Sequence, residues 1–336
     1  MDAIETRTAV EELFSQIGKV TWSDDTKPAR TERTLSAILD LGDMKRQMCS
    51  EFVSNASPKV INEFAGRFIN TNERDVLNIL VAPYFSERGL KLCKDKGIAC
   101  LDLCGNAYIR TAGLLIDRQG RENRFKVMRK QVNLFSTKSA WVVRSLLTAP
   151  GKGWTMKELA NASKVSLAQA FKVTESLQEE GFLNKARGNI RLIDASGLLD
   201  AWASAYRYEG NDFVGFYSPF KDRSEMFEGL RNCSECRYAL TMGSGASLVA
   251  PAVRSTDAYM YTLDIDRIKE ILGLVPMEFG GNVYVSVPKD GSVLRGTRTI
   301  DGLRVVSDLQ LYLDLFKYPQ RGREQSDEIR SRVLRF

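Results

Sequence analysis

The chain has 336 residues, of which 43% are hydrophobic and 27% are charged, and its formal net charge is +6. A single hydrophobic core usually stops growing at about 250 to 300 residues, so this length predicts two or three domains. The sequence contains no histidine, which excludes Ser-His and Cys-His catalytic arrangements and every histidine-containing zinc site. No apolar run approaches the roughly 18 residues of a membrane span, and the acidic N-terminus is unlike a signal peptide. We therefore expect a cytoplasmic protein without a membrane partner.

The N-terminal part of the chain is predicted to combine helices with a parallel pair of strands. Residues 1 to about 70 look mostly helical. Residues 76–82 form an apolar run that predicts a buried strand, Ser86 then opens a short helix that runs to Lys96, and residues 98–103 predict a second strand. Strand, helix and strand over so short a span are typical of a parallel pair in an α/β domain.

The segment VAPYFSERGLKLCKDKGIACLDLCGNAYI (residues 81–109) resembles the β-α-β tail of the restriction-endonuclease-like fold. The resemblance implies a nuclease-like domain over residues 1–130. In such nucleases an Asp and a Glu-x-Lys on upstream strands hold a divalent metal, and no upstream segment here has that pattern. Asp102 alone cannot supply the several oxygen ligands that metal-assisted hydrolysis needs. We expect a nuclease-like scaffold without nuclease chemistry.

Two pairs of cysteines have part of a zinc-site spacing. Cys233 and Cys236 are three residues apart, and Cys100 with Cys104 is a second pair. The pairs lie far apart in the sequence, and Cys100 sits in a strand-like run, where a small buried thiol is usual. We predict no metal and no other cofactor.

A basic run follows at residues 117–131. It contains Arg118, Arg121, Arg124, Lys126, Arg129 and Lys130. Such a run is either a solvated strand pair or linker, or a phosphate-contacting surface.

The clearest helix start and stop signals lie between residues 155 and 181. Thr155 with Glu158, and Ser166 with Gln169, have the capping-box spacing, in which a hydroxyl and a side chain three residues on satisfy unpaired backbone N–H groups. A helix is predicted from about residue 156 to 163 and another from 167 to 180, with Gly181 as the stop. Their shared apolar side is predicted to contain Leu159, Ala162, Val165, Ala170, Phe171, Thr174 and Leu177.

A preceding apolar helix near residues 142–147 and a following hairpin complete a recognisable unit. Residues 182–185 and 190–193 are predicted to be extended, with a turn at residues 186–189. Three helices and a small hairpin with a basic tip resemble a winged helix-turn-helix, which we place over residues 131–196.

The resemblance to winged-helix DNA-binding domains predicts contacts from the second helix of the motif and from the wing. Polar side chains of a recognition helix can bond base edges or phosphates, and a basic wing suits phosphates or the minor groove. The predicted DNA-contacting residues are Ser166, Gln169, Lys172 and Ser176 on the helix, and Lys185, Arg187, Asn189 and Arg191 on the wing. A packing or dimerisation module with solvated charges is the alternative.

The C-terminal third alternates predicted strands and helices. Residues 243–245 follow a strand and precede an acid, Asp257, at the next strand, a pattern similar to nucleotidyltransferases. Those enzymes need an Asp-x-Asp pair to hold two metal ions, and Asp257 lacks the second carboxylate. Asp264 and Asp266 have the spacing, but they begin a predicted helix, where Asp is an ordinary cap. We predict no transferase activity, and a tight strand-to-helix turn at the glycines.

Four segments carry a further resemblance. They are the winged helix, LLDAWASAY (residues 198–206), the turn at residues 241–246 and VVSDLQLYLDLFKYPQRGREQ (residues 305–325). Together they resemble AbiE-type antitoxins, the transcriptional-regulator half of type IV toxin–antitoxin systems. The similarity covers roughly residue 138 to the end. It implies a promoter-binding autorepressor whose partner is a nucleotidyltransferase-like toxin, with residues 197–336 as a regulatory domain. The N-terminal α/β domain is a departure from the short antitoxins.

The sequence thus predicts a three-part α/β protein of mixed α+β class that binds double-stranded DNA in a sequence-specific way, as a transcriptional regulator and not as an enzyme. Two other classes of function compete. One is a metal-dependent nuclease or a nucleotidyltransferase, and the other is a toxin-neutralising module that binds protein without touching DNA. The sequence is also compatible with a homodimer.

Overall fold

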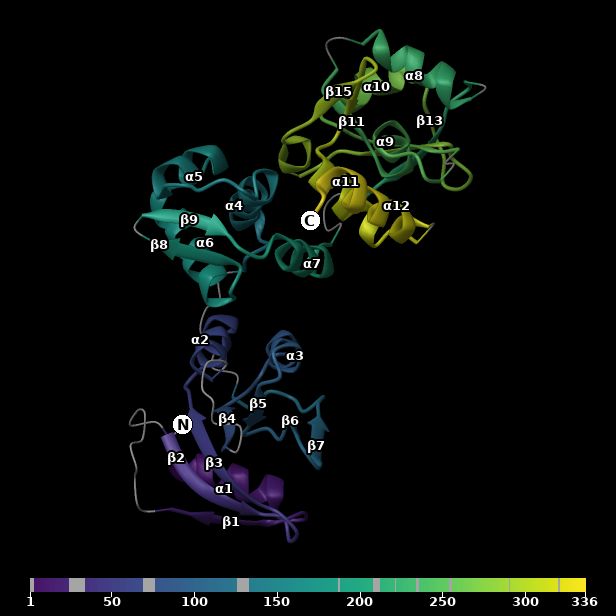
Figure 1. Cartoon of the computed structure of the whole chain (residues 1–336). Helices are drawn as coiled ribbons and strands as arrows, with labels where there is room; N and C mark the ends of the chain where they lie inside the picture. The colour runs from purple at the N-terminus through teal and green to yellow at the C-terminus, as the bar shows by residue number, and fades with distance from the viewer. Residues whose placement is uncertain are drawn as a thin grey trace. The chain divides into compact units, whose positions relative to one another are not determined.

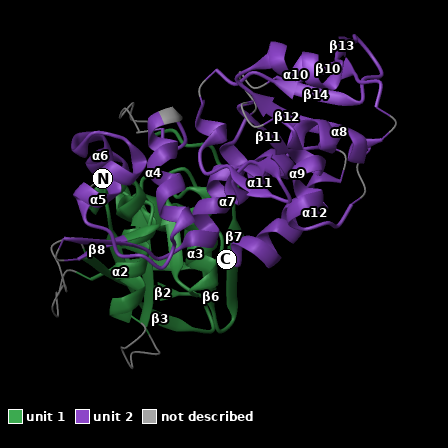
Figure 2. Ribbon diagram, turned by 90° about the horizontal axis from the view of Figure 1, so that it is seen from above, with its two compact units in different colours: residues 1–132, 174–183 green, residues 133–173, 184–336 purple. Residues whose placement is uncertain are grey.

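The computed structural model describes residues 3–23, 34–68, 76–125, 133–186, 188–207, 212–220, 222–233, 236–253, 256–289, 291–319 and 321–336. It is a mixed α/β structure with two seven-stranded sheets and one two-stranded sheet in the described residues. The chain divides into two compact units, residues 1–132 with 174–183, and residues 133–173 with 184–336 (Figures 1 and 2). Within the described ranges, no helix combines the length and the apolar character needed to cross a membrane.

Unit 1 is built on a sheet whose strands follow one another in chain order. Its elements are α1 (Ala3–Phe14), β1 (Lys19–Trp22), β2 (Thr34–Asp40), β3 (Lys45–Phe52), α2 (Pro58–Phe68), β4 (Val76–Ala82), α3 (Glu87–Asp95), β5 (Ala99–Asp102), β6 (Ala107–Thr111) and β7 (Leu114–Arg118). Strands β3, β4 and β5 are parallel and the other neighbours antiparallel. The predicted parallel pair is confirmed as β4 and β5, and Ser86 caps α3.

The prediction that the first 70 residues are mostly helical is wrong. Strands β1, β2 and β3 form an antiparallel meander there. In β2, Ala37 and Leu39 are buried whereas Ile38 between them is half-exposed, the period of two that a strand with one buried face requires. This short alternation is only a weak strand signal in the sequence. The strand is stabilised by pairing with other strands, which its own residues do not reveal.

The winged-helix region has the elements that the sequence predicts. They are α4 (Thr137–Thr148), α5 (Met156–Ser163), α6 (Leu167–Glu179), β8 (Leu183–Ala186), β9 (Asn189–Leu192) and the connecting helix α7 (Ala195–Ala205). The capping box at α5 is formed: the Thr155 N–H donates to Glu158 Oε2 over 2.8 Å, and the Glu158 N–H donates to Thr155 Oγ1 over 3.2 Å. Two backbone hydrogen bonds between Trp154 and Ile190 attach the segment before α5 to β9.

The rest of unit 2 is a second α/β layer structure. Its elements are β10 (Val214–Tyr217), α8 (Arg223–Arg231), β11 (Tyr238–Thr241), α9 (Met242–Val249), β12 (Ala258–Thr262), α10 (Ile265–Leu272), β13 (Val275–Pro276), β14 (Val283–Ser286), β15 (Arg298–Ile300), β16 (Leu303–Val305), α11 (Asp308–Phe316) and α12 (Gly322–Ile329). Helices α9, α11 and α12 pack together beside β11 and β12, and α8 and α10 contribute to the core on the sheet's apolar side (Figure 1).

A buried carboxylate lies at the centre of this second layer structure. Asp314 of α11 accepts hydrogen bonds from Thr241 Oγ1 at 2.6 Å, Gln310 Nε2 at 2.7 Å, Tyr206 Oη at 2.9 Å and Tyr261 Oη at 3.2 Å. Burial raises the pKa of Asp314 to about 6, and the hydrogen bonds oppose this rise. The Gln310 amide oxygen also accepts from Arg144 of α4 over 2.7 Å, so the network joins the C-terminal core to α4.

Candidate nucleic-acid interface

Helix α6 turns one face inward and leaves the other open. Ala170, Val173 and Leu177 are buried, at the spacing of three and four that one face of a helix requires. The predicted core position of Phe171 is wrong, because this side chain is 53% exposed. Phe171 follows the buried Ala170 directly, and consecutive helical residues lie about 100° apart around the axis. Ala162 of α5, also predicted to be buried, is exposed.

An aromatic ring on the exposed face of α6 contacts the wing, which is the hairpin of β8 and β9. The Lys185 ammonium of β8 lies 5.0 Å from the centroid of the Phe171 ring, a cation–π geometry. Lys172, next to Phe171, is exposed. We name Leu167, Ala168, Phe171, Lys172 and Lys185 the α6–wing surface. Composition alone could not assign Ala168 and Phe171 to this surface. A correct division of α6 into buried and exposed positions would have done so.

Ser166 and Gln169 mark the start of α6 and are partly engaged. The Ser166 hydroxyl accepts the Gln169 backbone N–H over 3.1 Å, which leaves its own proton for a further acceptor. The Gln169 side chain is half-buried and its amide donates to Ser139 Oγ of α4 over 3.4 Å. A contact from Gln169 to a base edge therefore requires this long bond to open.

The second half of α6 is less suited to DNA. Ser176 is half-buried and ten residues beyond Ser166, which corresponds to about 15 Å along the axis. Glu175 and Glu179, close to Ser176, bring negative charge to this half of the helix. The contacts that α6 can make to a polyanion are thus concentrated in its first two turns.

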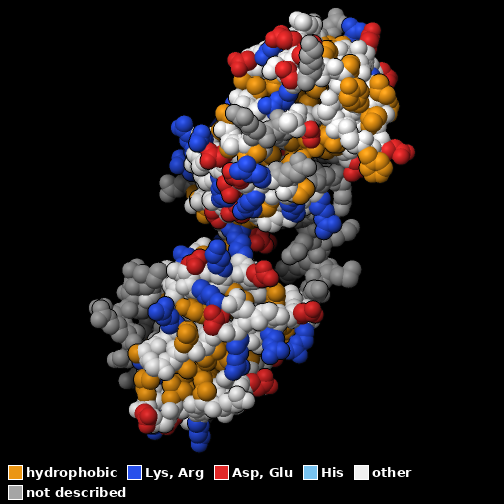
Figure 3. Space-filling model, turned by 90° about the vertical axis from the view of Figure 1, so that its right-hand side faces the viewer, with side chains coloured by type: hydrophobic (Ala, Val, Ile, Leu, Met, Phe, Trp, Pro, Cys, Tyr) orange, Lys and Arg blue, Asp and Glu red, His pale blue; other side chains and the backbone are white. Residues whose placement is uncertain are grey.

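The wing residues differ in where they lie. Arg191 of β9 is exposed. Asn189 is half-buried against the backbone of Gly153, where an added Cβ would come within 2.5 Å of the Asn189 Oδ1. Arg187 lies outside the described residues. Figure 3 shows acidic and basic side chains interspersed over the face that it draws, so the net charge of +6 is not gathered into a single basic field on that face.

Two buried acidic residues of unit 1, Asp102 and Glu51, make structural contacts. The Asp102 carboxylate accepts from the backbone N–H groups of Phe85, Cys104 and Asn106 at 2.9 to 3.0 Å, and from Asn106 Nδ2 at 2.8 Å. Glu51 of β3 forms an ion pair with Arg67 over 2.7 Å. In the described parts of the chain, no three His, Cys, Asp or Glu side chains come together to hold a metal ion.

The glycine-rich turn after β11 is tight, as the sequence predicts. Helix α9 begins at Met242 directly after Thr241. The Ser244 hydroxyl is buried and accepts the Tyr259 backbone N–H over 2.7 Å. A Cβ on Gly245 would lie 3.0 Å from the Leu311 Cδ1 and 3.1 Å from the Leu240 carbonyl oxygen, so this glycine allows α9 to pack closely.

The other candidate carboxylates and thiols also have local roles. Asp264 occupies the N-cap position of α10, but its side chain makes no capping hydrogen bond and pairs with Arg237 over 3.1 Å, while the Asp266 side chain is exposed. Cys233 and Cys236 form a disulfide. Cys100 and Cys104 are buried free thiols in unit 1.

The basic run is only partly within the described residues. Arg118 ends β7, and with Arg121 and Arg124 it lines a hollow of unit 1 that also contains Glu12 and Glu122. Lys126, Arg129 and Lys130 lie outside the described ranges. The described part therefore has acidic neighbours.

Comparisons of the chain with protein-family models, with curated proteins and with solved structures find no match.

Proposed function

We propose that the protein is a sequence-specific DNA-binding regulator of transcription that contacts duplex DNA through the α6–wing surface. The observation that carries the proposal is the position of Phe171. This large apolar ring lies outside the core, beneath the Lys185 ammonium and beside the exposed Lys172. A helix and a wing then present one continuous surface with both apolar and cationic groups.

The chemistry of this surface suits the major groove and its flanking phosphates. Alanine and phenylalanine side chains contact the methyl group of thymine, so Ala168 and Phe171 are suited to base reading. Lysine ammonium groups bind phosphate oxygens, which positions a protein on the duplex without reading its sequence. Ser166, at the start of α6, retains a hydroxyl proton for a base edge or a phosphate.

The proposal assigns the chain no catalytic activity. In support, the Asp102 carboxylate is occupied by hydrogen bonds from Phe85, Cys104 and Asn106, and Ser244 is buried against Tyr259. A narrower form of the proposal, an autorepressing cytoplasmic antitoxin with a nucleotidyltransferase-like toxin as partner, rests on the sequence resemblance alone. Co-purification with such a toxin encoded beside this chain would support it.

A second candidate function is protein binding through the same surface. Leu167 and Phe171 are 55% and 53% exposed, and two large apolar side chains on one helix face also suit a protein partner. Binding to DNA is preferred because Lys172 and Lys185 lie on the same surface.

Selection of duplexes from a random pool by the full-length protein tests the proposal. The enriched sequence should bind at least about a thousandfold more tightly than its scrambled version at physiological salt, the lower end of the usual ratio for specific binders. Phe171→Ala should lower the affinity for the enriched duplex more than for the scrambled one. Lys185→Ala should weaken both and reduce the slope of log affinity against log salt by about 0.9.

The matched control is Arg267→Ala. Arg267 is an exposed cation of α10 that pairs with Glu270 on its own helix, so its removal changes the net charge equally without altering the α6–wing surface. If the pool yields no enriched sequence, or if all three variants bind alike, the DNA-binding proposal is rejected in favour of a protein-binding module.

A further inference from the structure

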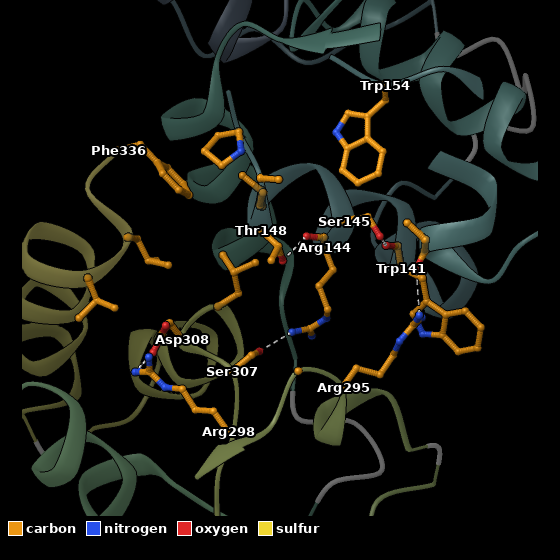
Figure 4. A pocket seen from close by; sticks show the side chains of 18 residues that line it. Trp141, Arg144, Ser145, Thr148, Trp154, Arg295, Arg298, Ser307, Asp308 and Phe336 are labelled. Atoms are coloured by element: carbon orange, nitrogen blue, oxygen red, sulfur yellow. Dashed lines mark hydrogen bonds and ion pairs between the residues drawn. The ribbon is translucent and has the colours of Figure 1, made fainter. Parts of the chain in front are cut away.

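A cavity of about 490 Å³ lies within unit 2, between the winged helix and the C-terminal core. Its walls come from α4, from the segment that leads into α5, from the chain before and at the start of β15, from the start of α11 and from the C-terminal residues 333–336. This volume is within the range of small-molecule sites, which lie preferentially between packed substructures. Figure 4 shows the side chains that surround it.

One part of the lining is cationic. Among the described lining residues, the side chains of Arg144, Arg295 and Arg298 face one acidic side chain, that of Asp308. Arg298 pairs with Asp308. Arg295 is half-buried, lies 4.7 Å from the ring centroid of Trp141, and donates to two backbone carbonyls, those of Ala162 and Ser163, each over 3.3 Å. The excess of guanidinium groups over carboxylates favours an anion.

The other part of the lining is apolar and includes two tryptophans. Trp141 and Trp154 both line the cavity, and the indole N–H of each is buried without a protein acceptor in the described residues. Trp154 itself is 93% buried, since 7% of it is exposed. Both indole nitrogens are themselves buried, so the two tryptophans offer the cavity apolar ring surface and not a hydrogen-bond donor. Leu147 and Phe336 supply further apolar surface.

We propose that this cavity binds a small organic carboxylate that carries an aromatic or aliphatic body. The carboxylate lies toward Arg295 and Arg144, and the body lies against Trp141, Trp154 and Leu147. Arg144 is held by Ser307 Oγ at 3.0 Å and by Gln310, so its guanidinium is fixed before a ligand arrives. The proposal does not depend on whether the α6–wing surface binds DNA.

The test uses the fluorescent amphipathic anion 8-anilinonaphthalene-1-sulfonate with the full-length protein. Its fluorescence should rise in a saturable way with one site per chain. Added 4-phenylbutanoate should displace it, whereas the neutral amide 4-phenylbutanamide should compete at least about tenfold less well, because charge-assisted hydrogen bonds to arginine are lost.

Two variants locate the site. Arg295→Met keeps an alkyl chain against Trp141 and removes the charge, so 4-phenylbutanoate should bind at least about tenfold more weakly. Ala162→Phe places a larger side chain in the lining while all three arginines stay, and it should abolish binding. The control is Arg267→Met on α10, away from the lining, which should leave the affinity unchanged.

Circular dichroism and the thermal midpoint establish that each variant is folded. If either variant fails to fold, the other variant and the comparison of carboxylate with amide still test whether the cavity binds the anion. The proposal is overturned if no saturable binding of either anion occurs up to millimolar concentration, if the amide competes as well as the carboxylate, or if the folded variants bind like wild type.

Discussion

Replacement of Asp314 by Asn should remove a pH dependence of stability from unit 2. Asp314 is fully buried, and four neutral side chains, those of Thr241, Gln310, Tyr206 and Tyr261, donate hydrogen bonds to it. Burial raises its pKa from 3.8 to about 6, so the folded state favours the protonated carboxyl. Asn cannot ionise and resembles the protonated form in shape.

The direction of this pH dependence follows from the linkage between protonation and folding. Because the folded pKa lies above the unfolded one, the stabilising contribution is fully present below pH 4 and is lost as the pH rises through about 6. The difference between the two pKa values corresponds to about 3 kcal/mol. About 1.4 kcal/mol of this is lost between pH 5 and pH 8.

Urea unfolding followed by tryptophan fluorescence at pH 5, 6, 7 and 8 measures the effect. Three of the four tryptophans, Trp141, Trp154 and Trp202, belong to unit 2 and report on it. The stability of wild type relative to Asp314→Asn should fall by about 1.4 kcal/mol from pH 5 to pH 8. Parallel pH profiles for the two proteins would refute the assignment of a raised pKa to Asp314.

Two further substitutions test local features of the fold. Thr155→Ala removes the capping box of α5 and should cost about 1 kcal/mol of unfolding free energy, measured by urea unfolding with Thr256→Ala, an exposed loop hydroxyl, as the control. Gly245→Ala adds a Cβ 3.1 Å from the Leu240 carbonyl oxygen and should lower the stability of unit 2 by about 1–3 kcal/mol, whereas Gly291→Ala, with open space around it, should change it little.

The helices of the winged-helix region could be predicted from the sequence because their signals are local. Thr155 and Glu158 bond to each other's backbone within one turn, and Lys164 ends α5 in the left-handed conformation just before Ser166 begins the next cap. Such contacts involve residues three or four apart and are visible in any short window.

The missed features depend on contacts between distant residues. Strand β2 is stabilised by pairing with β1 and β3, which its own sequence indicates only weakly. The Asp314 site brings together Tyr206, Thr241 and Tyr261 from three different segments. No spacing within one segment could have indicated it. In α6 the buried positions Ala170, Thr174 and Leu177 were predicted, but Phe171 was placed on the same face, which hid the apolar part of the α6–wing surface.

The most direct test of the central claim is photocrosslinking from position 171. p-Benzoylphenylalanine in place of Phe171 puts a short-range crosslinker at the middle of the α6–wing surface, and the same residue in place of Arg267 on α10 is the control. With the enriched duplex at physiological salt, irradiation should attach DNA at position 171 and not at position 267, and excess unlabelled enriched duplex should suppress the product while scrambled duplex should not. Equal crosslinking at both positions, or none to DNA at position 171, would contradict the account.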